Sequence, residues 1–271
     1  MSLSELGRTA HPYLVELPHV HAPYAYVLDY DRTLGDTAAA MDRFYDAAAP
    51  FGIDKAVVEE AKSAVENDGG SFSPLALARA RLAPIPGAYE QFRQNFIGGS
   101  RSLLYPDTRP LLGDLQSDPV TPHLVLTAGA DLAWQALKLA GSGYTGHAEI
   151  VPMRLNEAGI PKADPKGPVL AQWLGQSGTF SFVAMQDEAP VAVYTAEKAV
   201  LVDDKADALG GLPEGAQGVL IRRPSEKLLA SQKGELPEGA IVISSLAELQ
   251  INRPLVPADA PLGITKFIPL G

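Results

Sequence analysis

Short apolar runs alternate with longer segments of mixed polarity along most of the chain. Six runs have the length and composition of buried strands, at residues 24–30, 123–127, 147–153, 198–204, 218–223 and 240–245. Segments with helix-like boundaries separate several of them, at residues 107–117, 130–143 and 165–178. Short apolar strands joined by helices are typical of a parallel sheet covered on both faces. The pattern therefore predicts an α/β fold with a parallel sheet core and helices on both faces.

Between the first two predicted strands, the pattern changes to four helical segments in a row. Asp54 and Ser73 stand where helix N-caps are expected, and Pro74 takes the first helical position after Ser73. No apolar run of the strand type interrupts this stretch. We therefore expect residues 36–104 to form a small helical domain, inserted into a core made of residues 1–35 and 105–271.

Two segments do not fit this alternation. The segment up to Pro23 is rich in proline and histidine and has no clear period, so we expect an arm that lies over the domain. Residues 181–194 form an additional segment between predicted elements, and we interpret it as a hairpin.

Composition excludes several classes of function. The 271-residue chain has a formal net charge of -10, and its 22 lysines and arginines are scattered, so no nucleic-acid surface is expected. It contains no cysteine, which excludes disulfides and thiolate chemistry. No apolar run approaches a membrane span, and the N-terminus lacks a signal-peptide pattern. We expect a cytoplasmic protein without nucleic-acid or membrane partners, and the pattern specifies no oligomeric state.

Acidic residues gather where two of the predicted strands end. Asp29 and Asp31 follow the first strand, and Asp203 and Asp204 follow a later one. In open parallel sheets, ligands bind at the carboxyl ends of the strands, where these acids would meet. Like charges at such spacing repel unless a cation lies between them or one group is protonated. Clustered carboxylates are ligands for a hard divalent ion, so the sequence predicts a Mg²⁺ site.

A hydroxyl and an ammonium group are expected at the same edge of the sheet. Thr127 ends the second predicted strand. Lys166 directly precedes a helical segment and is the first candidate for the ammonium group, and Lys162 is the second. Taken alone, Thr127 would be a structural hydroxyl, and either lysine would be a solvated surface residue.

These acids and two histidines also fit other interpretations. Asp29 and Asp31 could cap a helix beginning near Thr33, but a second acid pair behind another strand argues against this. His19 and His21 form an H-x-H pattern that also resembles the start of amidohydrolases. Those enzymes need further histidine ligands, and only two histidines follow later in the chain. We therefore expect His19 and His21 to be solvated residues of the arm.

Four short motifs resemble those of the haloacid dehalogenase-like hydrolases, in the order that this family has them. They are "LDYDRTL" (28–34), "LVLTA" (124–128), a lysine in or near "PKADPKG" (161–167) and "VLVDD" (200–204). The resemblance covers residues 24–207, and "YPDTRPLLGDL" before the second motif also resembles family members with an inserted helical cap. It implies a Rossmann-like α/β core, with residues 36–104 as a small α-helical cap domain.

The resemblance also implies a chemical role for each motif. Asp29 would attack phosphorus as the nucleophile, and Asp31 would act as general acid and then general base. Thr127 would hold a phosphoryl oxygen through its hydroxyl. A lysine, Lys166 or else Lys162, would neutralise the transferring group and pair with Asp29.

Metal ligands follow from the same resemblance. They are Asp29, the backbone carbonyl of Asp31, and Asp203 and Asp204, the last two directly or through water. Asp207 could join them, although taken alone it is expected to be a surface helix residue. The residue after the second motif aspartate is often glycine in this family, and here it is Arg32. This departure alters the backbone freedom of the loop and places a cation beside the acids.

These features predict a Mg²⁺-dependent phosphomonoester hydrolase that acts on a small phosphorylated metabolite through an aspartyl-phosphate. A phosphomutase is the closest alternative, followed by a family member acting on a carbon–phosphorus or carbon–halogen bond. A phosphoacceptor signalling domain and a non-catalytic Mg²⁺/phosphate-binding protein are the alternatives from other classes. Further candidates for substrate binding are Tyr30, Ala128 and Lys162. Four arginines of the helical segment could also meet an anionic substrate: Arg79, Arg81, Arg93 and Arg101.

Overall fold

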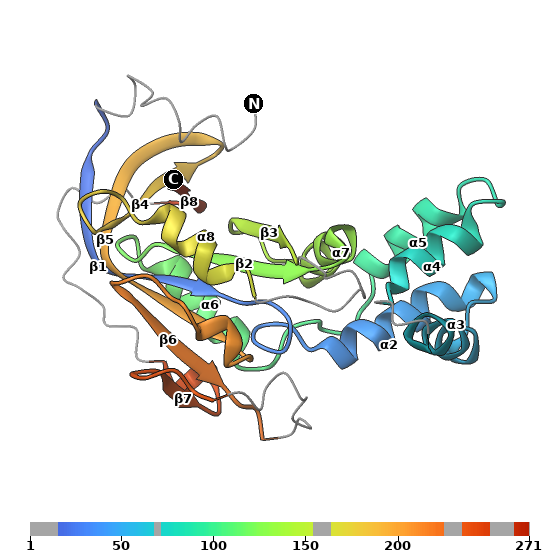
Figure 1. The fold of residues 1–271 in the computed structure, drawn as a ribbon. Coiled ribbons are helices and arrows are strands. Elements are labelled where there is room, and N and C mark those ends of the chain that lie inside the picture. The colour runs from blue at the N-terminus through green and yellow to red at the C-terminus, as the bar shows by residue number, and fades with distance from the viewer. Residues whose placement is uncertain (1–15, 68–71, 154–163, 225–234, 250–262, 271) are drawn as a thin grey trace.

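A single twisted sheet organises the molecule in the computed structural model (Figure 1). The structure describes residues 16–67, 72–153, 164–224, 235–249 and 263–270. Its strands are β1 (His19–Leu28), β2 (His123–Gly129), β3 (Ala148–Pro152), β4 (Phe180–Gln186), β5 (Ala189–Asp203), β6 (Ala216–Ile221), β7 (Ile241–Ile243) and β8 (Lys266–Leu270). Its helices are α2 (Thr37–Ala48), α3 (Lys55–Asn67), α4 (Pro74–Leu82), α5 (Ala88–Ile97), α6 (Thr108–Ser117), α7 (Leu132–Ser142) and α8 (Lys166–Trp173). Short 3-10 helices are η2 (Ala49–Phe51), η3 (Asp207–Leu209) and η5 (Leu246–Glu248).

Strand β1 lies in the middle of the parallel part of the sheet. The order β3-β2-β1-β5 continues through β6 to β7, and all of these neighbours pair in parallel. Strand β5 is long enough to change partners along its length. Its first half pairs antiparallel with β4, which pairs in turn with β8, and its second half pairs with β6. The predicted α/β class with a mostly parallel sheet is therefore confirmed.

Both faces of the sheet are buried, which explains why the strands read as continuous apolar runs. In β1, Val27 belongs to one core and Leu28 to the other, because successive side chains point to opposite faces. Helix α8 contributes Leu170 and Trp173 to the first core. Helix α6 contributes leucines to the second core, which also includes Leu139 of α7.

Helices α2 to α5 enclose an apolar cluster of their own beside the sheet (Figure 1). Its centre includes Phe44, Phe92 and Phe96, and Phe96 packs edge-on against Trp134 of α7. As the sequence predicted, an acidic or hydroxyl side chain begins two of these helices. Asp54 accepts a hydrogen bond from the backbone of Val57, and Ser73 caps α4. The division into a helical domain at 36–104 and a core remains a prediction.

Several predicted elements need correction. Residues 19–23 do not form an arm, because they extend β1 and pair with β5. His19 and His21 are nevertheless exposed, as expected, on the outward positions of this strand. Helix α8 ends at Trp173, earlier than the pattern indicated, and β8 had no clear signal in the sequence. The hairpin expected at 181–194 is present as the turn between β4 and β5.

Among the described residues, no helix combines the length and the apolar character that crossing a bilayer requires.

Candidate active site

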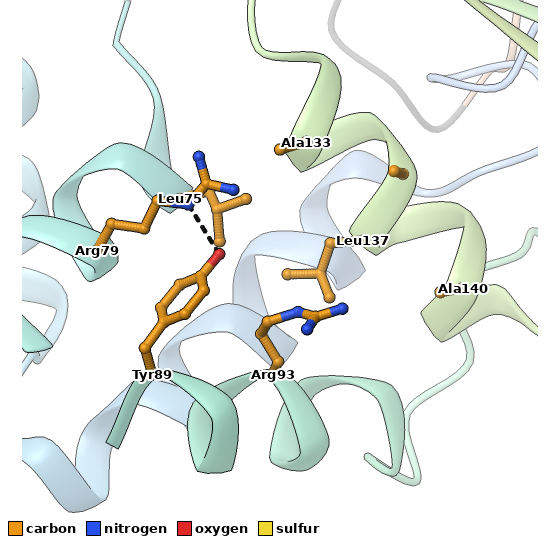
Figure 2. Close-up of a pocket in the computed structure, with 8 residues that line it drawn as sticks. Leu75, Arg79, Tyr89, Arg93, Ala133, Leu137 and Ala140 are labelled. Carbon is orange, nitrogen blue, oxygen red and sulfur yellow. Dashed lines mark hydrogen bonds between the residues drawn. The ribbon is translucent and has the colours of Figure 1, made fainter. Parts of the chain in front are cut away.

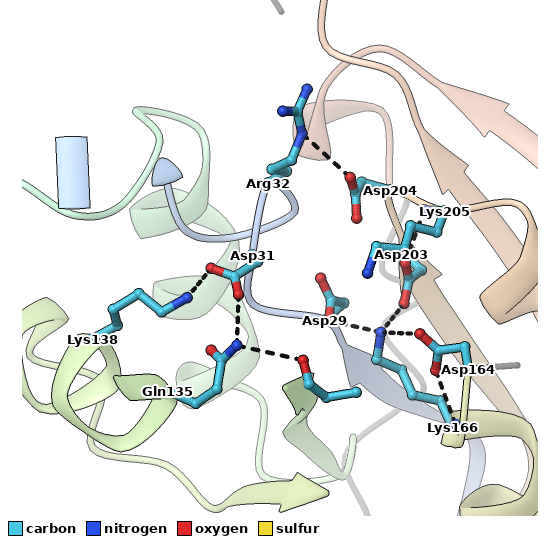
Figure 3. Close-up of polar contacts among 11 residues, drawn as sticks. Asp29, Asp31, Arg32, Gln135, Lys138, Asp164, Lys166, Asp203, Asp204 and Lys205 are labelled. Carbon is cyan, nitrogen blue, oxygen red and sulfur yellow. Dashed lines mark hydrogen bonds and ion pairs between the residues drawn. The ribbon is translucent and has the colours of Figure 1, made fainter. Parts of the chain in front are cut away.

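The tips of three neighbouring strands bring the motif residues together. Register pairs Leu28 at the end of β1 with Val202 of β5, and the backbone N–H of Asp29 donates to the Val202 carbonyl at 2.9 Å. Asp29 therefore lies beside Asp203, the last residue of β5, and Asp204 follows it. On the other side of β1, β2 carries Thr127 toward the same edge. Figure 3 shows these acids around the loop that follows β1.

Lys166 at the start of α8 connects the acids of β1 and β5. Its Nζ lies 2.9 Å from Asp29 Oδ1 and 2.5 Å from Asp203 Oδ2. Asp164 also contributes, since its Oδ2 lies 3.5 Å from the same Nζ and its Oδ1 accepts the Lys166 backbone N–H. All four side chains are buried. Of the two candidate lysines, the structure brings Lys166 to Asp29, while Lys162 lies outside the described residues.

Burial controls the protonation of this cluster. Burial raises the pKa of Asp29 to about 7, and the neighbouring charge of Asp203 adds to this effect. The Lys166 charge acts in the opposite direction but does not cancel it. Burial raises the pKa of Asp203 to about 6, again against Lys166 and with the help of Asp204. Burial alone would lower the pKa of Lys166, but its three carboxylate neighbours raise it well above the ordinary value. The ammonium group is therefore a permanent cation among acids that hold protons weakly at neutral pH.

Three buried carboxylates are suited to hold a divalent ion. One oxygen from each of Asp29, Asp203 and Asp204 lies within 4.8 Å of the others. Hard oxygen ligands in this number suit Mg²⁺, which binds a few carboxylates and keeps several waters. A divalent cation at this position would also stabilise the ionised carboxylates and so lower the pKa values of Asp29 and Asp203. Asp207 does not belong to this group and is exposed on η3.

Asp31 points away from Asp29, toward α7 (Figure 3). Lys138 Nζ donates to its Oδ1, and Gln135 Nε2 donates to its Oδ2 at 2.9 Å. Burial works against ionisation here, but the Lys138 charge and these hydrogen bonds keep the pKa of Asp31 below its usual range. Two hydrogen bonds from α7 thus hold the side chain in place. Its predicted metal contact through the backbone carbonyl remains a prediction.

Sequence reasoning missed the two α7 residues that hold Asp31. Gln135 and Lys138 are polar positions three residues apart in an otherwise apolar helix, so they share a face. That spacing was the available signal. Gly129 makes room for Gln135, because a Cβ at Gly129 would lie 2.7 Å from the Gln135 Nε2 atom. Lys138 is also buried and lies 5.7 Å from the ring centroids of Tyr30 and Trp134.

Arg32 adopts the backbone conformation that glycine favours at this position of the motif. Its φ is +62°, in the left-handed region, and its N–H donates to the Gly35 carbonyl at 2.8 Å. The guanidinium Nε lies 3.4 Å from Asp204 Oδ2 (Figure 3). The departure from glycine therefore places a further cation, besides Lys166 and Lys205, against the cluster of Asp29, Asp203 and Asp204.

Thr127 has a buried hydroxyl at the tip of β2. Its side chain is 0% exposed, and no described residue makes a hydrogen bond with its Oγ1. Buried hydroxyls are usually paired, so an unpaired one at a candidate site indicates a group that a ligand can satisfy. Thr33 Oγ1, in the loop after β1, is buried and unpaired in the same way.

Two further predicted substrate contacts have different outcomes. Tyr30 is 1% exposed, and its hydroxyl donates to the Lys138 carbonyl at 3.2 Å. Its side chain therefore packs in the core beneath the loop, and the substrate contact of Tyr30 stays a prediction. Ala128 is half-buried, and its carbonyl accepts from Gln135 at 3.4 Å. It stays a candidate.

The arginines of the helical segment lie away from the acids. Arg79 and Arg93 line a cavity of about 230 Å³ between α4, α5 and α7 (Figure 2). The α7 residues that line it, such as Ala133 and Leu137, lie on the helix face opposite to Gln135. In addition, Arg101 pairs with Asp42 at 3.1 Å on the surface, and Arg81 is exposed. None of the four therefore contacts the acid cluster.

Comparison with solved structures identifies the fold. A protein from Burkholderia xenovorans LB400, named as a haloacid dehalogenase-like hydrolase, superposes with a TM-score of 0.53 at 19% identity, covering 84% of this chain and 99% of its own. The HAD-hydrolase YfnB from Bacillus subtilis, bound to magnesium, superposes with a TM-score of 0.40 at 14% identity. The match covers 83% of this chain and 96% of the YfnB chain. A dehalogenase with an intermediate complex superposes with a TM-score of 0.41 at 18% identity. The match covers 84% of this chain and 96% of the dehalogenase chain. No family profile matches the sequence, and no curated protein matches it. The chain has the fold of the haloacid dehalogenase-like hydrolases.

Proposed function

We propose that the protein is a Mg²⁺-dependent phosphomonoester hydrolase that acts on a small phosphorylated metabolite. The observation that carries this proposal is the grouping of Asp29, Asp203 and Asp204 within 4.8 Å, with Lys166 Nζ 2.9 Å from Asp29. Phosphoryl transfer depends mainly on positioning and on charge stabilisation, and this site supplies anionic ligands and a fixed cation around one carboxylate. Bound Mg²⁺ would be held by the three carboxylates and would stabilise charge on the transferring group.

Each residue has a defined part in the proposed reaction. Asp29 attacks phosphorus in line, a bond forms between its oxygen and phosphorus, and the bond to the leaving oxygen breaks. Lys166 keeps Asp29 oriented and offsets the charge of the phosphoryl group. Thr127 donates its hydroxyl hydrogen to a phosphoryl oxygen. Water then attacks the aspartyl-phosphate and releases phosphate, which returns Asp29 to its ionised form.

We assign the proton exchange in both halves of this reaction to Asp31, whose side chain would have to turn from Lys138 and Gln135 to reach the substrate. It would take up a proton from solvent when the substrate binds and give it to the leaving oxygen in the first step, and it would accept a proton from the attacking water in the second. Lys138 and Gln135 favour its ionised form, which suits the second step directly. Asp31 also supports phosphoryl transfer over dehalogenation, because dehalogenases of this fold generally lack this second acid.

Helices α2 to α5 are proposed to act as a cap over the strand tips. They follow the Asp29 loop directly in the chain, and Ser73 at the start of α4 donates to Asp131 at the start of α7. This contact connects the helical cluster to the helix that holds Asp31. Residues of this cluster would select the substrate, together with the segment at 69–73, most of which lies outside the described residues.

Phosphate release from p-nitrophenyl phosphate, with Mg²⁺ and with a chelator, tests the proposal. We expect release with Mg²⁺ alone, and none above background in Asp29→Asn. A panel of small phosphorylated metabolites would then identify the substrate class. Chloride release from 2-chloropropionate without phosphate release would instead indicate a dehalogenase and contradict the proposal. Stable uptake of phosphate on the protein without turnover would indicate a phosphoacceptor domain, which also contradicts it.

A further inference from the structure

Arg32 occupies a backbone position that does not favour an arginine. Its φ of +62° lies in the left-handed region, where the Cβ of an L-residue crowds the backbone and glycine is favoured because it has no Cβ. The hydrogen bond from its N–H to the Gly35 carbonyl fixes this turn, so the conformation is set by the loop. Because the backbone does not favour an arginine here, we expect its side chain to make a contact that matters.

The side chain of Arg32 lies against one of the three candidate metal ligands. Its Nε is 3.4 Å from Asp204 Oδ2, and the two side chains are 16% and 3% exposed. Ion pairs that are this well covered are only weakly screened by solvent and salt. Asp204 therefore has a positively charged guanidinium group as its partner.

The three-carboxylate cluster therefore faces three cations, since the charge of Lys205 also acts on Asp29, Asp203 and Asp204. Lys166 contacts Asp29 and Asp203, and Arg32 contacts Asp204. A divalent ion at the cluster would share its carboxylates with both groups. Lys166 takes part in the proposed reaction, whereas Arg32 has no part in it. Its charge can therefore change without removing any group that the proposed reaction uses.

We propose that Arg32 is an internal counter-ion of Asp204 that weakens Mg²⁺ binding at the three-carboxylate cluster and so sets the affinity of this site for the metal. The proposal rests on the metal site of the proposed function. It predicts that a neutral residue which tolerates a positive φ, such as asparagine or glycine, raises the affinity.

Calorimetric titration of the full-length protein with Mg²⁺ tests this without any activity measurement. A single charge within 4–6 Å commonly changes the proton affinity of a carboxylate by ~1–3 pKa units, so removing a partly exposed one should lower the Kd for Mg²⁺ about tenfold. We expect this change in Arg32→Asn and Arg32→Gly. Arg32→Lys, which keeps the charge, should stay within about threefold of the wild type on the same argument.

Two controls separate the contact with Asp204 from other effects. Arg101→Asn makes the same change in net charge at a surface pair with Asp42, 3.1 Å long, and should leave the Kd unchanged. Asp204→Asn should abolish the gain, so that Arg32→Asn has no effect in that background, as a double-mutant cycle requires. Thermal denaturation of each variant confirms that it is folded.

The outcomes distinguish this proposal from the proposed function. Tighter binding in Arg32→Asn that depends on Asp204 supports the proposal. Measurable and equal Mg²⁺ binding in wild type and Arg32→Asn overturns it and leaves the metal-dependent function standing. A gain of the same size in Arg101→Asn also overturns it, because net charge alone would then be the cause. Absence of Mg²⁺ binding in every variant overturns both this proposal and the metal-dependent function.

Discussion

Two buried threonines of opposite hydrogen-bond status allow a quantitative test of the site. Thr127, at the tip of β2, is 0% exposed, and its hydroxyl has no partner among the described residues. Thr108, at the start of α6, is also 0% exposed, but its hydroxyl donates to the Leu34 carbonyl at 2.9 Å. Replacing each by valine changes nearly the same atoms and should have opposite effects on stability.

The expected free energies follow from the hydroxyl groups. A buried polar group without a partner costs roughly 1–3 kcal/mol, so Thr127→Val should raise the free energy of unfolding by about 1–2 kcal/mol. Thr108→Val should lower it by about 1–2 kcal/mol, because the Leu34 carbonyl loses its donor. For a chain of this size, each kcal/mol corresponds to a change in Tm of about 2–4 °C.

Activity should change in the opposite sense at Thr127. If its hydroxyl donates to the phosphoryl group, losing a hydrogen bond to a charged group of about 1.5–3 kcal/mol lowers kcat/KM roughly 10- to 150-fold. Thr108→Val should keep the wild-type kcat/KM. The assays are urea denaturation followed by circular dichroism, and hydrolysis of p-nitrophenyl phosphate. A Thr127→Val protein that is less stable than wild type, or equally active, would refute the reasoning.

Further predictions concern buried charge, pH and packing. Lys166→Met leaves Asp29, Asp164 and Asp203 without the ammonium group that contacts them. Urea denaturation at pH 7.5 should show that the free energy of unfolding falls by about 3–5 kcal/mol, and a fall below about 1 kcal/mol would contradict this. Burial lowers the pKa of His123 below its ordinary 6.5, so below that pH the unfolded chain binds a proton that the folded protein refuses. Stability should therefore fall by up to about 1.4 kcal/mol per pH unit from this group, and denaturation of His123→Phe at pH 7.5 and 5.5 should show a smaller fall than wild type. Gly129→Ala displaces Gln135 from Asp31 and should reduce kcat about tenfold, a typical loss for a misplaced catalytic group, whereas Gly113→Ala, in open space on α6, should leave activity unchanged.

The sequence specified the parts of the site that follow directly from strand ends. Asp29 and Asp203 each come directly after an apolar run, and parallel pairing of β1 with β5 forces these two positions together. The acid pairs were therefore predictable as a cluster. The role of each as a metal ligand or nucleophile remains a prediction that geometry supports.

Contacts that depend on helix rotation were not predictable. Lys138 reaches Asp31 only because one particular face of α7 is turned toward the strand tips, and the sequence pattern does not define that rotation. Asp107 illustrates the same difficulty at a helix start. It directly precedes α6, where an acidic side chain commonly caps a helix, but its carboxylate accepts from Arg223 at 3.0 Å and from Ser245 at 2.7 Å instead. In both cases the contact that forms is with a residue far along the chain, which local sequence patterns do not specify.

Lengths of β strands were misjudged where side chains are exposed on one face. Residues 19–23 alternate between exposed and buried positions in β1, but prolines and histidines hide this period in the sequence. The antiparallel pair β4 and β8 extends the sheet beyond the parallel core, and β8 is too short and too distant in sequence to be recognised by pattern.

The most direct test of the central claim is to trap the covalent intermediate. The protein is incubated with Mg²⁺ and p-nitrophenyl phosphate, quenched in acid during turnover, reduced with borohydride and digested for peptide mass spectrometry. Borohydride converts a phosphorylated aspartate to homoserine and leaves other residues unchanged. The account predicts homoserine at position 29, and none in protein quenched without substrate. Turnover without any homoserine at position 29, or with homoserine at another aspartate, would contradict it.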